Sequence, residues 1–254
     1  MHPDLELALD LADEADRLSL ARFRARDLVV DTKPDLTPVS EADRAVEDMI
    51  RTRLAAARPT DAVLGEEEGA SGEGPRRWIV DPIDGTSNFV RGIPVYATLI
   101  ALEENGEMVV GVASAPALGR RWWASRGEGS FADGDPITVS RVAALGDAHL
   151  AYDSNVDLEP SGVRARFEAL ERRVWRTRGF GDFWIHVLVA EGSVDVAIEP
   201  GPKIWDLAAL IVIVEEAGGR LTDVAGNRTA AGGGAVTTNG LLHDEVVAAL
   251  ADGG

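Results

Sequence analysis

The apolar run WIVDPIDGTSNF (residues 78–89) limits the folds open to this chain more than any other segment, because it ends on two carboxylates. Burying Asp81 and Asp84 at the end of a core strand destabilises a fold unless a partner offsets their lost hydration. Pro82 has no N–H and disfavours the helical conformation at Asp81, so we expect the strand to end there in a turn. Both carboxylates can then point at one position.

The residues after this turn are suited to an anion. Residues 85–88, GTSN, can begin a short helix whose first N–H groups would bind phosphate beside the two carboxylates. A metal site next to a phosphate cradle is what a metal-assisted phosphoester hydrolase requires. The segment is also ordinary turn chemistry: taken alone, an Asx-turn at Asp84 and a cap at Asp81 explain it better.

A second acidic segment is LGEEEG (64–69), which follows a short strand pattern and precedes a Gly-rich loop. We expect Glu66 to face inward as a ligand, and Glu67 and Glu68 to face solvent. A fully solvated charge run is the alternative.

A third segment, WDLAALIVIVEEAGG (205–219), is apolar almost all round and therefore predicts a buried helix that begins at Asp206. Most aspartates in such a place are N-caps, and an N-cap can still present its outer carboxylate oxygen to a metal. Together the three segments offer only oxygen ligands, which favours Mg²⁺ over zinc or copper.

The composition excludes several other classes of function. A net charge of −18, from 25 Lys and Arg against 43 Asp and Glu, would repel nucleic acids and anionic membranes. It would also repel anionic substrates, so a phosphate-handling protein of this charge needs metal ions at its site. Without cysteine there is no disulfide, thiolate nucleophile or Cys-based zinc site. The histidines lack metal-binding spacing, and we expect surface or hydrogen-bonded core positions for all of them: His2, His149, His186 and His243.

The first residues and the hydropathy predict a soluble cytoplasmic protein. The N-terminal segment MHPDLELALDLADEADRL is acidic and amphipathic and lacks the apolar core of a signal peptide. No apolar run reaches the ~20 residues that a membrane span needs.

The apolar periodicity predicts a single unit, residues 1–254, in two parts. Residues 1–147 form an α+β part with the acidic motifs at 64–69 and 78–89, and residues 148–254 form an α/β part that carries Asp206. Asn105-Gly106 between two strand patterns predicts a hairpin. We expect helices over 4–24, from Ser40 onward, 161–173, 183–191, 205–217 and 241–250, a Pro-rich loop over 31–40, and strands at 61–64, 77–81, 95–103, 108–115, 121–125, 148–152, 194–198, 219–223 and 234–238.

Taken in order, these segments resemble the inositol monophosphatase-like family of Mg²⁺-dependent, lithium-sensitive phosphatases over nearly the whole chain. WIVDPIDGTSNF and WDLAALIVIVEEAGG are similar to its two signature motifs, and TKPDLTPVSEAD (32–43) is similar to its N-terminal segment. Within the family, SAPALGRRWWASRGEGSF, RTRGFGDFW and TNGLLHDE look most like the actinobacterial histidinol-phosphate phosphatases. Two places differ from that branch: Ser87 stands where lysine is common, and residues 152–161 are dissimilar.

The resemblance implies a layered αβαβα sandwich, usually a homodimer, with two to three Mg²⁺ ions in each subunit. Glu66, Asp81 and the Ile83 carbonyl would hold the first ion. The second ion would be held by Asp81, Asp84 and Asp206, and a third, weaker ion would share Glu66.

The resemblance also assigns Asp43, Thr86 and Glu66 to catalysis, with Thr86 and Asp43 as the dyad that orients the attacking water. Gly85, Thr86 and Ser87 would bind the phosphate. Asp43 has a second interpretation, because Ser40 to Asp43 also fits a capping box. Lys33 would be a charge partner near the third metal or simply a loop cation.

Histidinol phosphate carries an ammonium and an imidazole, so its pocket should offer carboxylates beyond the metal ligands. Asp182, in GFGDFW, and Glu199, at an expected strand end, stand where the family binds the remainder of its substrates. The alternatives are an N-cap for Asp182 and a solvated strand-end carboxylate for Glu199.

Two other functions remain open at this point. One is the same chemistry on inositol monophosphate, a sugar bisphosphate or a 3'-phosphoadenosine nucleotide. The other is a catalytically silent relative that acts as a binding or scaffold protein. The full set of acidic ligands argues against the second, since each unused buried carboxylate would cost on the order of several kcal/mol.

Overall fold

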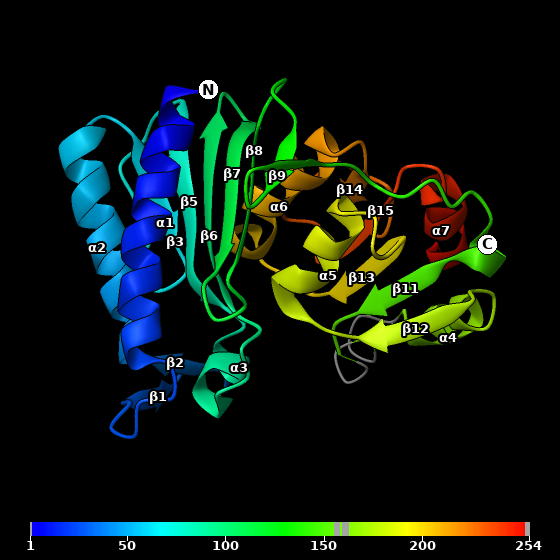
Figure 1. Ribbon diagram of the computed structural model, residues 1–254, viewed down its shortest axis with the longest axis horizontal. Helices are drawn as coiled ribbons and strands as arrows, with labels where there is room; N and C mark the ends of the chain where they lie inside the picture. The colour runs from blue at the N-terminus through cyan, green and yellow to red at the C-terminus, as the bar shows by residue number, and fades with distance from the viewer. Residues whose placement is uncertain (1, 155–157, 159–162, 252–254) are drawn as a thin grey trace.

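The computed structural model describes residues 2–154, 158 and 163–251. Its layers run helix, sheet, helix, sheet, helix (Figure 1). The layered αβαβα sandwich implied by the resemblance is therefore confirmed. Most of the dissimilar segment 152–161 and the start of the helix expected at 161–173 lie outside the described residues.

The larger sheet belongs to the first part of the chain. Its strands follow the order β10-β9-β8-β7-β6-β5-β3-β4, and all neighbours are antiparallel except β3 and β5. Their bounds are β3 Ala62–Gly65, β4 Gly69–Ser71, β5 Arg76–Asp84, β6 Ala97–Glu104, β7 Glu107–Ala115, β8 Arg120–Ser125, β9 Ser130–Ala132 and β10 Asp135–Ile137.

The smaller sheet belongs to the second part. It follows the order β12-β11-β13-β15-β14, with β11 parallel to both its neighbours and the remaining pairs antiparallel. Its strands are β11 His149–Tyr152, β12 Arg176–Gly179, β13 Val196–Pro200, β14 Arg220–Thr222 and β15 Gly234–Thr238.

Helices cover both faces of each sheet. The outer face of the large sheet carries α1 (Pro3–Arg22) and α2 (Glu41–Ala57), and the outer face of the small sheet carries α4 (Arg164–Glu171) and α7 (His243–Leu250). Between the sheets lie α5 (Asp182–Ala190) and α6 (Ile204–Glu216). Four short elements complete the described chain: the hairpin strands β1 (Val30–Thr32) and β2 (Pro38–Ser40), the helix α3 (Thr86–Arg91) and a 3₁₀ turn at Leu145–Asp147.

The central helix α6 is buried all round, as its composition predicts. Every residue from Leu207 to Val214 is buried. It approaches β7 so closely that a Cβ added at Gly111 would lie 2.2 Å from the Ala209 carbonyl oxygen. Because α6 comes from the second part of the chain and packs on the sheet of the first, the two parts share one core. The boundary at residue 147 stays a prediction.

β5 departs from the expectation where it matters most for the site. The strand does not end at Asp81 but continues to Asp84 across a bulge, with Asp81 opposite Leu99 and Asp84 opposite Ala97. At the bulge, Pro82 and Ile83 together lie opposite Thr98, so the missing N–H of Pro82 does not interrupt a regular ladder. Both carboxylates therefore remain part of the buried sheet.

Several short strands were not expected from the sequence. The Pro-rich loop at 31–40 contains the β1–β2 hairpin, and β4, β9, β10 and β12 are strands of three or four residues. Their apolar pattern is weak because their pairing is decided by the strands beside them. The hairpin at Asn105-Gly106 is confirmed, with positive φ at both residues.

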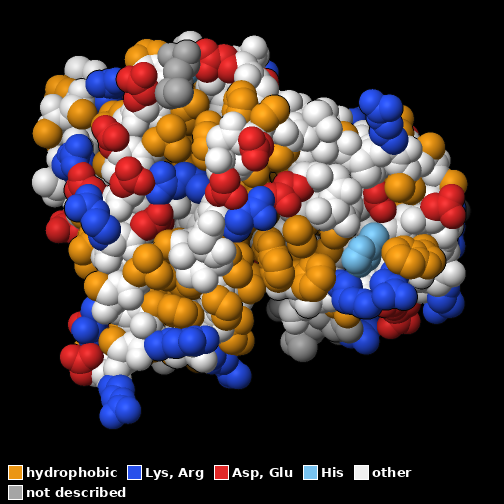
Figure 2. Space-filling view, in the orientation of Figure 1, with side chains coloured by type: hydrophobic (Ala, Val, Ile, Leu, Met, Phe, Trp, Pro, Cys, Tyr) orange, Lys and Arg blue, Asp and Glu red, His pale blue; other side chains and the backbone are white. Residues whose placement is uncertain are grey.

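No helix in the described ranges is long and apolar enough to cross a membrane. On the face shown in Figure 2, Lys and Arg side chains lie among the Asp and Glu side chains, so the negative charge is not gathered there into one acidic field.

Candidate active site

Acidic residues from distant parts of the chain meet around one cavity of about 280 Å³. Its wall combines the β1–β2 hairpin, the β5 bulge, the start of α3, the start of α5 and the segment that joins β13 to α6. The lining residues are Asp35, Thr37, Pro38, Glu66, Asp81, Ile83, Asp84, Gly85, Thr86, Ser87, Asp182, Glu199, Gly201, Lys203, Trp205 and Asp206.

Three carboxylates converge at the base of this cavity. Asp81, Asp84 and Asp206 each place an oxygen so that the three atoms lie within 4.8 Å of one another. A backbone N–H holds each side chain: Ile83 N donates to Asp81 Oδ1 at 3.0 Å, Phe183 N to Asp84 Oδ2 at 2.8 Å and Lys203 N to Asp206 Oδ2 at 2.6 Å. Each of these backbone bonds engages one oxygen of its carboxylate and fixes the side chain in the wall.

These hydrogen bonds correct the structural alternatives considered from the sequence. The Asx-turn is formed by Asp81 rather than Asp84. Asp84 instead caps α5, whose first turn includes Phe183. Asp206 is the third residue of α6 and reaches back to Lys203, so it caps the helix without being its N-cap residue.

The three carboxylates destabilise one another when all are ionised. Burial raises the pKa of Asp81 well above its usual range, and the charges of Glu66, Asp84 and Asp206 raise it further. The pKa of Asp84 is also raised well above its usual range, first by burial and then by the charges of Asp182 and Asp206. Burial is also the main cause that raises the pKa of Asp206 to about 6.

A divalent cation fits this donor set. The converging atoms are all carboxylate oxygens, which are the ligands of hard cations such as Mg²⁺. The raised pKa values show that the wall leaves a surplus of negative charge that a bound cation would balance.

Thr86 and Asp43 lie in contact next to these carboxylates. Thr86 Oγ1 is 3.0 Å from Asp43 Oδ1 and 2.9 Å from the Ile83 carbonyl oxygen. The capping box is present too, because Asp43 Oδ2 accepts hydrogen bonds from Ser40 N at 2.8 Å and from Ser40 Oγ at 2.5 Å. The two interpretations of Asp43 thus use different oxygens of one buried carboxylate.

The chain turns sharply between the β5 bulge and α3. Gly85 has φ 79°, a left-handed conformation that favours glycine, and it is the N-cap residue of α3. The first N–H groups of α3, from Thr86 and Ser87, have no carbonyl partner within the helix. They lie in the cavity wall beside Asp81 and Asp84.

Glu66 lines the same cavity, and its backbone N–H donates to the carbonyl of Val80, the residue before Asp81. Its Oε1 accepts a hydrogen bond of 2.7 Å from Lys33 Nζ, which also donates to Glu67 Oε1 at 2.7 Å. The expectation that Glu67 faces solvent is wrong, since its side chain is only 8% exposed. Lys33 and the fold of this loop withdraw it from water, whereas Glu68 is exposed as expected.

Asp182 and Glu199 form the remaining acidic part of the wall. Asp182 is the first residue of α5 after the N-cap Gly181, so it is not an N-cap, and its Oδ2 accepts a hydrogen bond of 2.6 Å from Asn88 Nδ2. Burial, then the charges of Asp153 and Asp206, raise the pKa of Asp182 to about 7. Glu199 is not a solvated strand-end residue, because it is buried and contacts His186.

Comparison with known proteins agrees with this geometry. The model of the inositol monophosphatase family matches residues 1–253. The histidinol-phosphatase of Mycobacterium tuberculosis is 57% identical over 258 aligned residues that cover 99% of each protein. The chain belongs to the inositol monophosphatase family.

Two further similarities extend over nearly the whole length. The histidinol-phosphatase of Streptomyces coelicolor is 53% identical over 97% of this chain and 96% of that protein. The crystal structure of the extragenic suppressor protein SuhB from Bartonella henselae has a TM-score of 0.90 at 32% identity and covers 98% of both chains. The inositol monophosphatase fold is therefore present without a missing or added layer.

The structure brings together every residue that the sequence singled out for this site. Most of them line the cavity itself. Two lie just behind the wall: Asp43 contacts Thr86, and Lys33 contacts Glu66. The individual roles inferred from the inositol monophosphatase resemblance remain predictions.

Sequence reasoning missed residues that support the wall from behind. Glu47 is fully buried on α2 and accepts hydrogen bonds from Glu67 N at 2.8 Å and Glu68 N at 3.0 Å. The signal was present, because Glu47 shares a helical face with the apolar Ile50 and Leu54. His186 and Asn88, which contact Glu199 and Asp182, gave no comparable signal.

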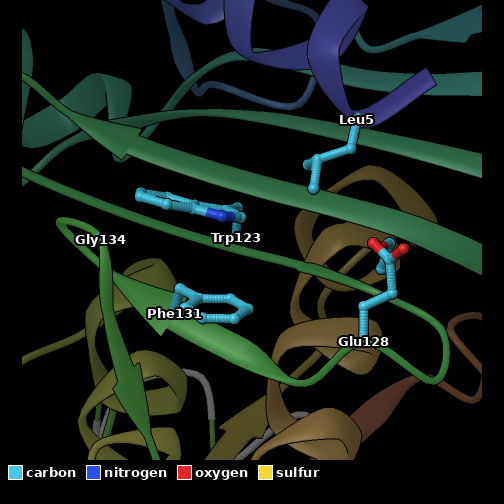
Figure 3. Close-up of a pocket in the computed structure, with 6 residues that line it drawn as sticks. Leu5, Trp123, Glu128, Phe131 and Gly134 are labelled. Atoms are coloured by element: carbon cyan, nitrogen blue, oxygen red, sulfur yellow. The ribbon is translucent and has the colours of Figure 1, made fainter. Parts of the chain in front are cut away.

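A larger cavity of about 550 Å³ lies elsewhere, beside the start of α1. Figure 3 shows it with the rings of Trp123 and Phe131 facing each other; their centroids are 6.1 Å apart. The carboxylate of Glu128 in its wall already accepts hydrogen bonds from Ser125 Oγ and His2 N. Among the described residues that line this cavity, Glu128 is the one carboxylate, and no second acidic or basic group converges on it.

Proposed function

We propose that this protein is a Mg²⁺-dependent phosphate monoester hydrolase that converts L-histidinol phosphate and water to L-histidinol and phosphate, a step of histidine biosynthesis. The observation that carries the reaction class is the convergence of Asp81, Asp84 and Asp206 within 4.8 Å, next to the first N–H groups of α3. A cation site beside an anion site matches the charge distribution of a phosphate ester bound through metal ions.

The metal ligands proposed are those that the family resemblance implies, and the convergence of Asp81, Asp84 and Asp206 supports one of the sets. Asp81, Glu66 and the Ile83 carbonyl would hold one Mg²⁺, and Asp81, Asp84 and Asp206 a second. A third ion would share Glu66, and it would then compete with Lys33 for the Glu66 carboxylate. Bound Mg²⁺ would lower the pKa of the attacking water and stabilise negative charge on the leaving oxygen.

The protein's own groups would hold the reactants. Thr86 Oγ1, fixed between Asp43 and the Ile83 carbonyl, would accept a hydrogen bond from the attacking water and orient it. The N–H groups of Gly85 and Thr86, with Ser87, would bind the phosphate oxygens. The water oxygen then forms a bond to phosphorus while the bond from phosphorus to the substrate oxygen breaks, and the departing oxygen takes up a proton to become the alcohol.

The choice of histidinol phosphate rests on the far wall of the cavity and on the relatives. Asp182 and Glu199 add two carboxylates beyond the metal ligands, which suits an ester that carries an ammonium group. The two full-length relatives at 57% and 53% identity are named histidinol-phosphatases.

Ser87 is the position at which this chain differs from that branch. It is exposed at the cavity rim, where its hydroxyl can donate one hydrogen bond to a phosphate oxygen but adds no positive charge. The phosphate would then be neutralised by the metal ions and the α3 N–H groups, without a charge from position 87.

Inositol 1-phosphate is the second candidate substrate, because the whole chain matches the inositol monophosphatase family. The test is phosphate release by the purified protein with Mg²⁺ from L-histidinol phosphate, inositol 1-phosphate and fructose 1,6-bisphosphate. We expect a strong preference for the first. A preference for either of the others would replace the proposed substrate, and no turnover of any ester would favour a binding or scaffold role.

From the family resemblance alone, we also propose a cytoplasmic homodimer that lithium inhibits. Size-exclusion chromatography with light scattering gives the oligomeric state, and a monomer would contradict it. Titration of the hydrolysis rate with LiCl, against KCl as the control salt, tests the second point.

A further inference from the structure

The proposed reaction leaves unused a buried histidine directly behind the cavity wall. His186 on α5 is 0% exposed. Both its ring nitrogens have partners: Nε2 is 2.9 Å from Glu199 Oε2, and Nδ1 is 2.7 Å from Thr237 Oγ1. The imidazole thus connects the core of the small sheet with a carboxylate of the cavity.

The fold places these three side chains together. Ala197 lies opposite Thr237 in the β13–β15 pair, and Glu199 follows on the same face of β13. α5 covers that face, where its Ile185 packs with Ala197. His186 therefore meets Glu199 from the core side of the wall.

Burial decides the protonation state of the ring, and its two partners decide which nitrogen carries the hydrogen. Burial lowers the pKa of His186 to about 3, so near pH 7 the imidazole is neutral and has one donor and one acceptor. An ionised Glu199 can only accept a hydrogen bond. Nε2 then donates to Glu199, and Nδ1 accepts from the hydroxyl of Thr237.

Because the imidazole of His186 is neutral, its hydrogen bond affects the position of Glu199 but not its charge. It holds the carboxylate in place without cancelling its negative charge, in contrast to Lys33, which pairs with Glu66 as a cation. When a cationic ligand favours the ionised form of Glu199, the whole negative charge of the carboxylate faces that ligand.

Glu199 needs a hydrogen bond that fixes its position, because the carboxylates around it repel its negative charge. Besides burial, the carboxylates of Asp206, Asp84, Asp153 and Asp182 raise its pKa well above the usual range. In the described part of the chain, His186 is the one side chain that hydrogen-bonds Glu199, and it engages only Oε2. The Oε1 atom is left for a ligand.

We propose that His186 is a positioning residue that holds Glu199 in the cavity wall, so that the free oxygen of Glu199 receives the ammonium group of the substrate. His186 would thereby set the preference for a cationic phosphate ester over a neutral one. The inference rests on the proposed function, because it assigns the ammonium of L-histidinol phosphate to Glu199.

The test compares two esters. We define the preference ratio as kcat/KM for L-histidinol phosphate divided by kcat/KM for glycerol 2-phosphate, which carries no ammonium. His186→Leu should lower this ratio about tenfold or more, mainly by raising KM for L-histidinol phosphate, as expected for a lost charge-assisted contact. His186→Gln, whose amide can donate from the place of Nε2, should restore most of the ratio.

His243 offers a matched control. It is buried, and its ring nitrogens lie 3.0 Å from the hydroxyls of Thr222 and Thr238, but it does not line the cavity. His243→Leu removes an equally buried imidazole and should lower the melting temperature while keeping the preference ratio of the wild type.

Glu199→Gln supplies the coupling measurement. If His186 acts through Glu199, the double variant His186→Leu/Glu199→Gln should have the same preference ratio as Glu199→Gln alone. Should His186→Leu fail to fold, Thr237→Val keeps the shape of that side chain, removes the hydroxyl that orients the ring, and should lower the ratio about threefold.

The outcomes separate the two proposals. If the wild type hydrolyses glycerol 2-phosphate but not L-histidinol phosphate, the proposed substrate fails and this inference fails with it. If the wild type prefers L-histidinol phosphate and a folded His186→Leu or Thr237→Val keeps that preference, only the role of His186 is overturned.

Discussion

The carboxylates of this site divide their two oxygens between structure and chemistry. Asp81, Asp84 and Asp206 each accept a backbone N–H with one oxygen, and each also places an oxygen within 4.8 Å of the other two residues' oxygens. Asp43 shows the same division between its capping box and Thr86. Turn or cap formation and ligand binding are therefore not competing explanations of these residues, because one carboxylate can accept several hydrogen bonds.

Asp84→Asn tests this division. The amide oxygen of Asn can still accept from Phe183 N, so the fold should survive, while the loss of a charged ligand should lower kcat by at least ~10²-fold. The measurement is the rate of phosphate release, with circular dichroism to check folding. Asp10→Asn on the exposed side of α1 is the control. Unchanged turnover would remove Asp84 from the site.

Glu47→Gln tests the support of the Glu66 loop. One carboxylate oxygen would become an amide N–H₂ facing the backbone N–H of Glu67 or Glu68, so we expect a loss of about 1–3 kcal/mol in unfolding free energy. Mg²⁺ affinity should fall as well, because Glu66 precedes that loop. Urea titration and calorimetry measure the two effects, with the exposed Asp48→Asn as the control on the same helix.

At the scale of elements, the position of α6 decides whether the site exists. It carries Asp206 from the second part of the chain onto the sheet that carries Asp81 and Asp84. The close contact with β7 requires glycine at position 111, where a Cβ would meet the Ala209 carbonyl oxygen. Packing between α6 and β7 and ligand geometry are thus coupled.

Gly111→Ala should show this coupling. The added methyl would push α6 away from β7, at a cost of about 1–3 kcal/mol in unfolding free energy, and the shift of Asp206 should weaken Mg²⁺ binding. Gly146→Ala is the control, because a Cβ there meets nothing closer than 3.9 Å. Equal stability of the two variants would show that α6 tolerates a wider separation.

At the scale of the whole molecule, the two sheets and their helices press several acidic groups into one poorly solvated volume. The pKa values of Asp81 and Asp84 are raised well above the usual range. The pKa of Asp206 is raised to about 6 and that of Asp182 to about 7. A carboxyl group whose pKa is raised by folding stabilises the fold while it is protonated. That contribution is lost as the pH rises from about 4 through the raised values.

Metal-free protein should therefore lose stability between about pH 5 and pH 8, and Mg²⁺ should restore it. We expect saturating Mg²⁺ to raise the melting temperature by at least about 3 °C more at pH 8 than at pH 5.5. Calorimetry of EDTA-treated protein with and without Mg²⁺ measures this, and Asp84→Asn should reduce the difference. An equal increment at both pH values would contradict the electrostatic account.

Much of the fold follows from patterns local in sequence. The helices that became α1, α2, α6 and α7, the Asn105-Gly106 hairpin and the long central strands all have the apolar period or turn residues of their type. The short edge strands and the β5 bulge do not, because their conformation depends on neighbouring strands. Pro82 suggested the end of a strand when only pairing with β6 could show that the strand continues.

The same distinction applies to the site. The sequence alone determined which residue types could act as ligands: carboxylates, with no cysteine and no paired histidines. It thereby limited the site to one that binds a hard cation beside an anion. Only the tertiary structure decided which oxygens face the cavity, that Glu67 turns inward toward Lys33, and that His186 stands behind Glu199. The physical reason is that local patterns report which face of an element is apolar, whereas a buried polar group is defined by partners far away in the chain.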